Sequence, residues 1–206
     1  MKRALLTTLL LWLCVAVPAP AADPAEAQRL IEQTAAETKK ALAERQAELQ
    51  ADPDAVFDLV EDILLPHADF EAIAQLVLGR HWRTASPEQR QRFTEEFRDL
   101  IVRTYARSLL AYQDFEIRTL PLRPSNKDDR TTVRAEVVTG ERPPIQVDYT
   151  MCHRGGRWKI CNVTIDRTIN FVINYRKQID EQIRRDGLDG VIAMISDRNA
   201  RMAVRQ

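Results

Sequence analysis

Residues that mark catalytic and cofactor sites are scarce in this chain of 206 residues. It has only six glycines, and each lies at an expected turn or helix end, so none is left for a phosphate-binding loop. The three histidines, His67, His81 and His153, are far apart without metal-ligand spacing, and no serine occupies a G-x-S-x-G motif. We therefore expect no catalytic residue, no metal and no cofactor.

An excess of charge of either sign is also missing, because 30 basic residues balance 30 acidic ones. The two signs are interleaved along the expected helices, so no basic surface for nucleic acid is predicted. Hydrophobic residues make up 45% of the chain, which is enough for one compact domain with a sizeable core.

The N-terminus has the pattern of a secretory signal peptide. A basic start precedes an apolar run over residues 4–17, and Ala19-Pro20-Ala21 forms an A-x-A cleavage site. The run is shorter than the roughly 20 residues of a membrane span. Cys14 lacks the small preceding residues of a lipoprotein signal. We predict that residues 1–21 are a signal peptide and that residues 22–206 form a single exported domain.

Two cysteines, Cys152 and Cys161, remain in the mature chain and flank an expected hairpin. A turn at Gly155-Gly156 would make them diagonal neighbours, whereas a turn at Gly156-Arg157 would place them directly opposite. In an oxidising compartment nearby thiols tend to pair, although a diagonal pair strains the bridge. We predict a disulfide, with two free thiols as the alternative.

Capping motifs and apolar residues at helical spacing predict the helices. Asp23-Pro24, Asp52-Pro53 and Ser86-Pro87 are helix starts, and Gly79 and Gly187 are helix ends. The first helix carries an apolar stripe that includes Leu30, Ile31, Thr34, Leu42 and Leu49. The predicted helices then cover residues 53–65, 70–78, 87–113, from 168 to 186, and about 189–199.

Between residues 115 and 165 the apolar period changes from about 3.6 to 2, which predicts strands. The four runs are Phe115–Thr119, Val133–Val137, Ile145–Met151 and Trp158–Ile165. The last run shifts parity around Cys161, which predicts a β-bulge. The fold class is therefore α+β, with helices packed on one apolar face of a four-stranded antiparallel sheet.

The helix over residues 70–78 is apolar on nearly every side, which is more than one packing face requires. Its composition alone favours a dry core, and an apolar ligand cavity is the alternative interpretation.

Several segments, taken in order, resemble the MlaC family of periplasmic phospholipid-binding proteins, also called toluene-tolerance proteins. They are Leu64-Leu65-Pro66, residues 74–82 (AQLVLGRHW), residues 85–93 (ASPEQRQRF), Arg142-Pro143-Pro144, residues 156–159 (GRWK) and residues 186–191 (DGLDGV). Each is weak alone, but their order and spacing are specific and span essentially the whole mature chain. Residues 166–170 depart from the family's E-G-V-S segment, so we expect the loop before the C-terminal helix to differ.

The resemblance implies a twisted four-stranded antiparallel sheet of NTF2/cystatin-like type. About six or seven helices would wrap it, leaving a lipid cavity between sheet and helices. It also implies a monomeric periplasmic carrier for a diacyl phospholipid, which maintains outer-membrane lipid asymmetry. The implied partners are the outer-membrane lipoprotein MlaA with porin, and an inner-membrane ABC transporter whose MCE-domain subunit is MlaD. Transport direction, headgroup preference and docking surfaces have no recognisable motif.

The candidate lipid-binding residues lie on the apolar faces of these helices and strands. Tyr105 and Tyr149 are the best individual candidates, because each places a polar tip on an apolar face. The full set is Phe70, Ile73, Leu76, Val77, Phe97, Ile101, Tyr105, Leu109, Val133, Val137, Val147, Tyr149, Met151, Ile169 and Val172.

Two other functional classes fit the same composition. A hydrolase would need a buried acid or base, which the apolar strand faces do not offer. A protein-binding chaperone or adaptor would use the same apolar residues as an exposed groove.

Overall fold

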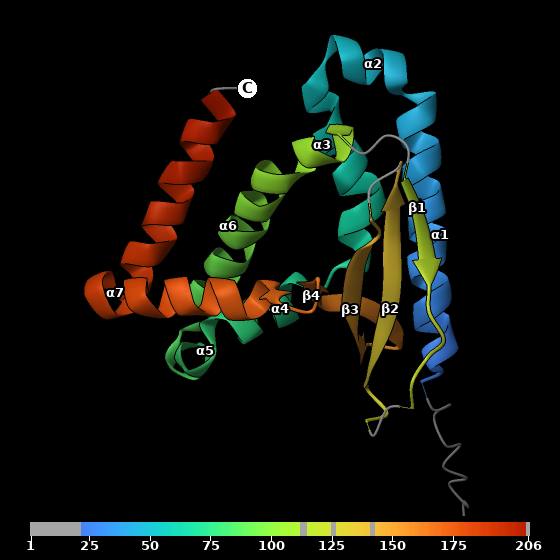
Figure 1. The fold of residues 1–206 in the computed structure, drawn as a ribbon. Helices are drawn as coiled ribbons and strands as arrows, with labels where there is room; N and C mark the ends of the chain where they lie inside the picture. Colours follow the sequence, from blue (N-terminus) through green and yellow to red (C-terminus); the bar gives the residue numbers. More distant parts are fainter. Residues whose placement is uncertain (1–21, 112–114, 125–126, 141–142, 205–206) are drawn as a thin grey trace, which may run out of the picture.

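The computed structural model describes residues 22–111, 115–124, 127–140 and 143–204. In these ranges the chain forms seven α-helices and one five-stranded sheet (Figure 1). The predicted signal peptide over residues 1–21, together with Tyr112 and Arg142, lies outside the described residues. No helix in the described ranges has the length and apolar character needed to cross a membrane.

The N-terminal segment begins with α1 (Pro24–Glu44), whose first turn is capped by the Asp23 side chain accepting from the Ala25 N–H at 2.9 Å. The first predicted helix continued past Leu42 to Leu49. In the structure α1 ends before Arg45, and a separate short helix, α2 (Gln46–Ala51), follows. Neither Gly nor Pro marks this break, so the sequence pattern could not indicate it.

The predicted helix that follows Asp52 is a series of short turns instead of one regular element. Val60–Leu64 is a π-helix, which has one more residue per hydrogen-bonded turn than an α-helix and shifts the direction of its side chains. The series is η1 (Pro53–Ala55), α3 (Val56–Leu59), η2 (Val60–Leu64) and η3 (Leu65–His67).

Helix α4 (Phe70–Leu78) ends at Gly79, as predicted, where the backbone takes a φ of 54° that favours glycine. The short helix α5 (Arg80–Thr84) follows and was not predicted. Helix α6 (Pro87–Tyr105) begins with the predicted capping box, in which Ser86 and Gln89 exchange hydrogen bonds of 3.0 and 3.2 Å.

The last two predicted helical regions differ from the structure, the first in where its α-helix ends and the second in its continuation beyond Gly187. The predicted helix 87–113 stops as an α-helix at Tyr105 and tightens into the 3-10 helix η4 (Ala106–Ala111). Helix α7 (Phe171–Val204) consists of two arms that meet at Gly187, whose φ of 71° and ψ of 172° are not helical (Figure 1). Gly187 was the predicted end of the penultimate helix.

The sheet is antiparallel with strand order β1-β2-β3-β4-β5. Its first four strands are β1 (Phe115–Thr119), β2 (Arg130–Thr139), β3 (Ile145–Arg154) and β4 (Arg157–Ile165), which match the four predicted runs. The prediction of four strands was wrong, because β5 (Ile169–Asn170) adds a fifth, with Ile169 opposite Ile165. Two residues carry too little periodicity to be recognised, and β5 exists through its pairing with β4.

The β3–β4 hairpin turns at Gly155-Gly156, so Cys152 pairs with Lys159. The register shifts where Thr150 faces Asn162 but Met151 faces Ile160, which makes Cys161 the extra residue of the predicted bulge. Cys152 and Cys161 form a disulfide with a Cα–Cα distance of 5.9 Å, and both pack against Ala72 of α4. The bridge therefore joins the two strands at the bulge.

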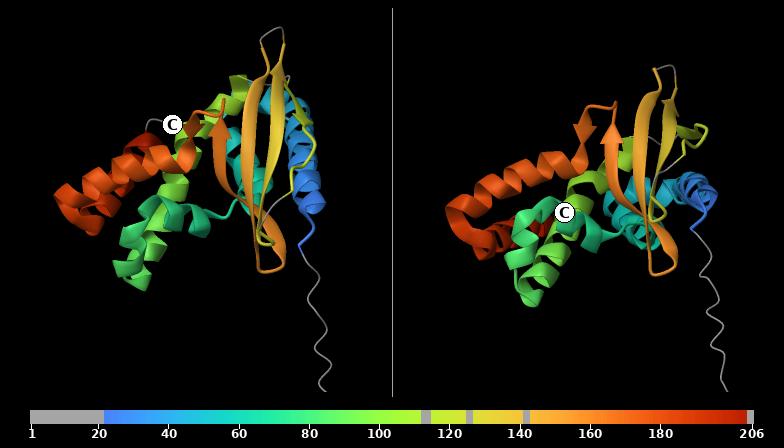
Figure 2. Two further views of the ribbon diagram at one scale, coloured as in Figure 1. Left: turned by 60° about the horizontal axis from the view of Figure 1, so that its bottom comes forward. Right: turned by 90° about the horizontal axis from the view of Figure 1, so that it is seen from below.

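The buried apolar residues form distinct cores. One core joins α4, α6 and the two arms of α7, beside the end of the sheet that β4 and β5 form (Figure 2). We call it the helical core. Two further clusters lie where α1, which contacts β1, β2 and β4, and the segment over residues 49–65 pack against the sheet.

Candidate functional site

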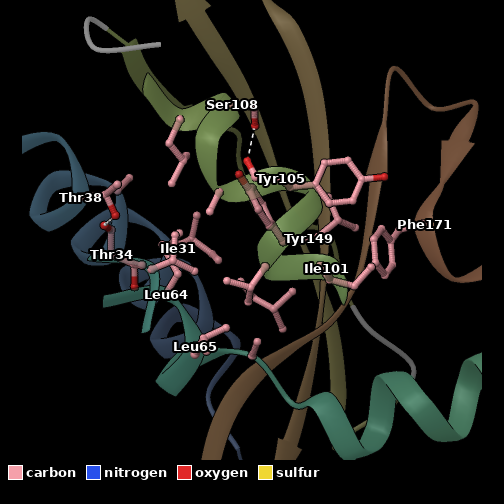
Figure 3. A pocket seen from close by; sticks show the side chains of 18 of the residues that line it. Ile31, Thr34, Thr38, Leu64, Leu65, Ile101, Tyr105, Ser108, Tyr149 and Phe171 are labelled. Carbon is pink, nitrogen blue, oxygen red and sulfur yellow. Dashed lines mark hydrogen bonds between the residues drawn. The ribbon is translucent and has the colours of Figure 1, made fainter. Parts of the chain in front are cut away.

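An apolar cavity of about 470 Å³ lies between the sheet and the helices (Figure 3). This volume is within the range of about 300–1,000 Å³ that is typical of small-molecule sites. Within the described ranges 24 residues line it, of which six carry a polar side-chain group and none is charged. The cavity can therefore enclose the apolar body of a ligand, and these 24 residues offer no charged group for acid–base chemistry.

The sheet wall of the cavity follows from strand alternation. Ile117 of β1 faces Val137 of β2, and Tyr149 of β3 faces Val163 of β4, so these four side chains share one face. Ile160 also lines the cavity although it is three residues from Val163. In a regular strand residues three apart point to opposite faces, so the bulge at Cys161 is what places both of them in the wall.

Helix α4 separates the cavity from the helical core. Phe70 and Ile73 line the cavity and also contact the helical core, whereas Ala74, Val77 and Leu78 lie in the helical core and are absent from the cavity lining. This helix is apolar on nearly every side because it borders two apolar environments.

Seven of the predicted site residues line the cavity. They come from α4, α6, η4, β2 and β3: Phe70, Ile73, Ile101, Tyr105, Leu109, Val137 and Tyr149.

The other eight predicted residues lie elsewhere. Leu76, Val77, Phe97 and Val172 belong to the helical core or pack against it. Val133 and Met151 pack under α1 with Trp158, and Val147 is buried in β3. Ile169 is 52% exposed, because β5 places it at the edge of the sheet. Periodicity identifies an apolar face, but it does not distinguish a face that meets a cavity from one that meets other side chains.

Sequence reasoning did not include the wall formed by α1 and the segment η2–η3. Ile31, Thr34 and Thr38 come from α1, and Leu64 and Leu65 come from η2 and η3. A signal was present, since Ile31 and Thr34 lie in the first predicted stripe and Leu64-Leu65-Pro66 is one of the family segments. Ser108 and Asn162 also line the cavity and carried no sequence signal.

The solvent side of the cavity lies where α6 passes into η4. Tyr105 and Ser108 are its exposed lining residues, and the Tyr105 side chain is 48% exposed. The Tyr105 hydroxyl lies 3.2 Å from that of Tyr175, and its ring packs edge-on against Phe171. Tyr149 is different, because burial raises the pKa of its hydroxyl to about 12. An aromatic mouth thus leads to a neutral, mostly apolar interior. Within the described ranges no group of acidic, histidine or cysteine side chains could hold a metal ion.

Comparisons with known proteins agree with this geometry. The family model for the MlaC protein matches residues 32–197. Toluene tolerance protein ttg2D from Pseudomonas putida is 29% identical over 163 residues, covering 78% of this chain and 74% of the relative. The intermembrane phospholipid transport system binding protein MlaC from Haemophilus influenzae is 25% identical over 134 residues, covering 64% of this chain and 63% of the relative.

A solved structure extends the similarity to three dimensions. The phospholipid-binding protein from Ralstonia solanacearum, in complex with a phospholipid, matches with a TM-score of 0.77 and 27% identity. The match covers 86% of this chain and 99% of that protein. The two proteins therefore share the same overall fold.

Proposed function

Because the chain belongs to the MlaC family, we propose that it binds the acyl tails of a diacyl phospholipid in its cavity and carries that lipid through the periplasm. The observation that carries this proposal is the cavity of about 470 Å³, whose described lining residues are uncharged, in a fold shared with a protein whose structure contains a phospholipid. We further propose that residues 1–21 are a signal peptide that directs export, and that residues 22–206 form a single domain that acts as a monomer. The lipid would be its cargo, and no cofactor would be needed.

The physical requirement for such a carrier is to hide two acyl tails from water. At about 0.8 kcal/mol per methylene, roughly thirty methylenes represent a gross hydrophobic cost of about 24 kcal/mol. A bilayer shelters the tails equally well, so the free-energy difference between membrane and carrier can be small. Partners on either side can then set the direction of transfer.

The proposed partners are the outer-membrane lipoprotein MlaA with its porin and the inner-membrane transporter that bears the MCE-domain subunit MlaD. Shuttling between them would maintain outer-membrane lipid asymmetry. The family membership and the phospholipid named with the Ralstonia solanacearum protein support this assignment.

Native mass spectrometry of protein purified from the periplasm tests the carrier function directly. We expect one bound diacyl phospholipid per chain, with mixed headgroups because the described part of the chain places no charged residue in the cavity lining. Organic extraction should identify the lipid, and delipidated protein incubated with vesicles should regain it. Lipid-free protein that takes up nothing from vesicles would contradict the proposal, and retention of unfolded polypeptide instead would favour the adaptor function.

A further inference from the structure

The mouth of the cavity carries one large side chain. Among the lining residues that the structure describes, only Tyr105 and Ser108 are exposed. Ser108 is small, and its Oγ donates to the Tyr105 carbonyl, so its side chain is held at the backbone. The Tyr105 side chain lines the cavity and also reaches water. A lipid tail that enters or leaves on this side therefore has to pass Tyr105.

Two contacts hold the Tyr105 side chain in this position. Its hydroxyl lies 3.2 Å from the hydroxyl of Tyr175, and either of the two groups can donate the hydrogen bond. Its ring lies edge-on to Phe171, with the ring centroids 6.5 Å apart (Figure 3). Tyr105 is the last residue of α6, whereas both partners lie on the first arm of α7. The Tyr105 side chain therefore joins two helices beside the mouth.

The α7 side of this contact is anchored in the helical core. The Tyr175 ring packs edge-on against the buried Phe97 at 5.1 Å and is tilted against Phe171 at 4.8 Å. Burial raises the pKa of Tyr175, and the hydrogen bond with Tyr105 raises it further, so the Tyr175 hydroxyl is partly shielded from water. Water replaces a hydrogen bond to such a group less well than one on an open surface.

The Tyr105 side of the contact lies where the chain can move. The α-helix changes to a 3-10 helix directly after this residue, and residues at the ends of elements are common sites of local motion. The side chain is also about half exposed. Rotation of the Tyr105 ring away from α7 breaks one hydrogen bond and one ring contact, and it leaves the helical core packed.

We propose that the hydroxyl pair of Tyr105 and Tyr175 is a latch that closes the mouth of the cavity and limits the rate at which lipid enters and leaves. This inference rests on the proposed carrier function and adds control of its exchange step. The latch acts on the barrier between a closed and an open mouth. It therefore changes the rates of entry and release by the same factor and leaves the binding equilibrium unchanged.

Two kinetic experiments with the purified exported protein test the latch. Protein loaded with deuterated diacyl phosphatidylcholine is mixed with an excess of vesicles of the unlabelled lipid, and native mass spectrometry follows its release. Delipidated protein mixed with the same vesicles reports uptake. Tyr105→Phe and Tyr175→Phe each keep the ring but break the hydroxyl pair. Each should raise both rates about two- to fivefold, which corresponds to a hydrogen bond of about 0.5–1 kcal/mol.

A double variant distinguishes one latch from two separate effects. Both single substitutions remove the same interaction, so Tyr105→Phe combined with Tyr175→Phe should exchange lipid no faster than either single variant. The amount of lipid bound at equilibrium should stay at the wild-type level in all three variants, because uptake and release change together.

Ser196→Ala is the matched control. Ser196 Oγ donates to Glu96 Oε1 at 2.7 Å, so this change also removes one side-chain hydrogen bond between α6 and α7. Neither residue belongs to the described lining of the cavity. The variant should therefore exchange lipid at the wild-type rates.

The outcomes separate the latch from the carrier function. Unchanged rates in either tyrosine variant would overturn the latch while leaving a lipid carrier. Additive effects in the double variant, or an equal acceleration in Ser196→Ala, would also overturn it, because they would indicate general loosening between α6 and α7. A reduced equilibrium lipid content would assign the hydroxyls to affinity and not to the rate. Wild-type protein that takes up no lipid would contradict the proposed function itself.

Discussion

At the scale of single residues, Tyr149 shows how the cavity controls the ionisation of a polar group. Its side chain lines a chamber in which the lining residues that the structure describes are all uncharged. Burial disfavours the phenolate, which is why the pKa of Tyr149 rises to about 12 from an ordinary value near 10. The folded protein therefore retains the Tyr149 proton more strongly than the unfolded chain does.

This difference predicts a pH dependence of stability. Because the folded pKa is the higher one, the contribution of Tyr149 is fully present below pH 10 and is lost as the pH rises through 12. The loss should amount to about 2–3 kcal/mol of unfolding free energy. Urea unfolding across this pH range should show a steeper decline for the wild type than for Tyr149→Phe. Parallel declines would show that the hydroxyl is not shielded from water.

At the scale of elements, the sequence was most informative where local chemistry determines structure. The starts of α1 and α6, the ends at Gly79 and Gly187, the four long strands and the bulge at Cys161 all follow from capping residues or from parity. The short strand β5 and the break at Arg45 do not, because they depend on long-range pairing and packing.

The cavity required the same kind of long-range information. Apolar spacing indicated that Val77 and Ile73 of α4 are both buried. Both belong to the helical core, but Ile73 also reaches the cavity, whereas Val77 is not among its lining residues. Which residues of α4 face the cavity depends on where α4 lies relative to the sheet. That position depends on the tertiary packing of α4 with β4, α6 and α7.

The two apolar sides of α4 should respond differently to truncation. Val77 is 1% exposed in the helical core, so Val77→Ala should lower the unfolding free energy by about 1–3 kcal/mol and leave lipid content per folded molecule unchanged. Phe70 lines the cavity, so Phe70→Ala should enlarge the chamber and shift bound lipids toward longer tails. Its stability cost in loaded protein should be below the about 3–5 kcal/mol typical of a dry core.

Urea unfolding and lipid mass spectrometry of the same preparations check this pair of variants. An altered lipid profile in Val77→Ala with an unaltered one in Phe70→Ala would contradict the assignment of the two sides.

At the scale of the whole molecule, the cavity lies beside the helical core and does not share most of its residues. Phe93, Phe97 and Leu100 of α6 pack with Val191 and Ile192 of α7 in the buried helical core. The cavity is enclosed by α1, η2, η3, the C-terminal part of α6, η4 and the strands, with α4 contributing to both regions (Figure 3). Removal of the cargo should therefore weaken one part of the molecule more than the other.

Hydrogen exchange of loaded and delipidated protein tests this separation. A ligand that binds only the folded state stabilises it by mass action, and local opening is most affected in the elements that contact the ligand. We expect delipidation to speed amide exchange in α1 around residues 31–38, in η4 and in β3. The second arm of α7, over residues 188–204, should keep its protection, because it packs in the helical core and contributes no residue to the cavity lining. Reloading with phospholipid should restore protection in the first group. A uniform loss over both regions would show that the cavity and the helical core unfold as one unit, and a loss confined to α7 would place the cargo elsewhere.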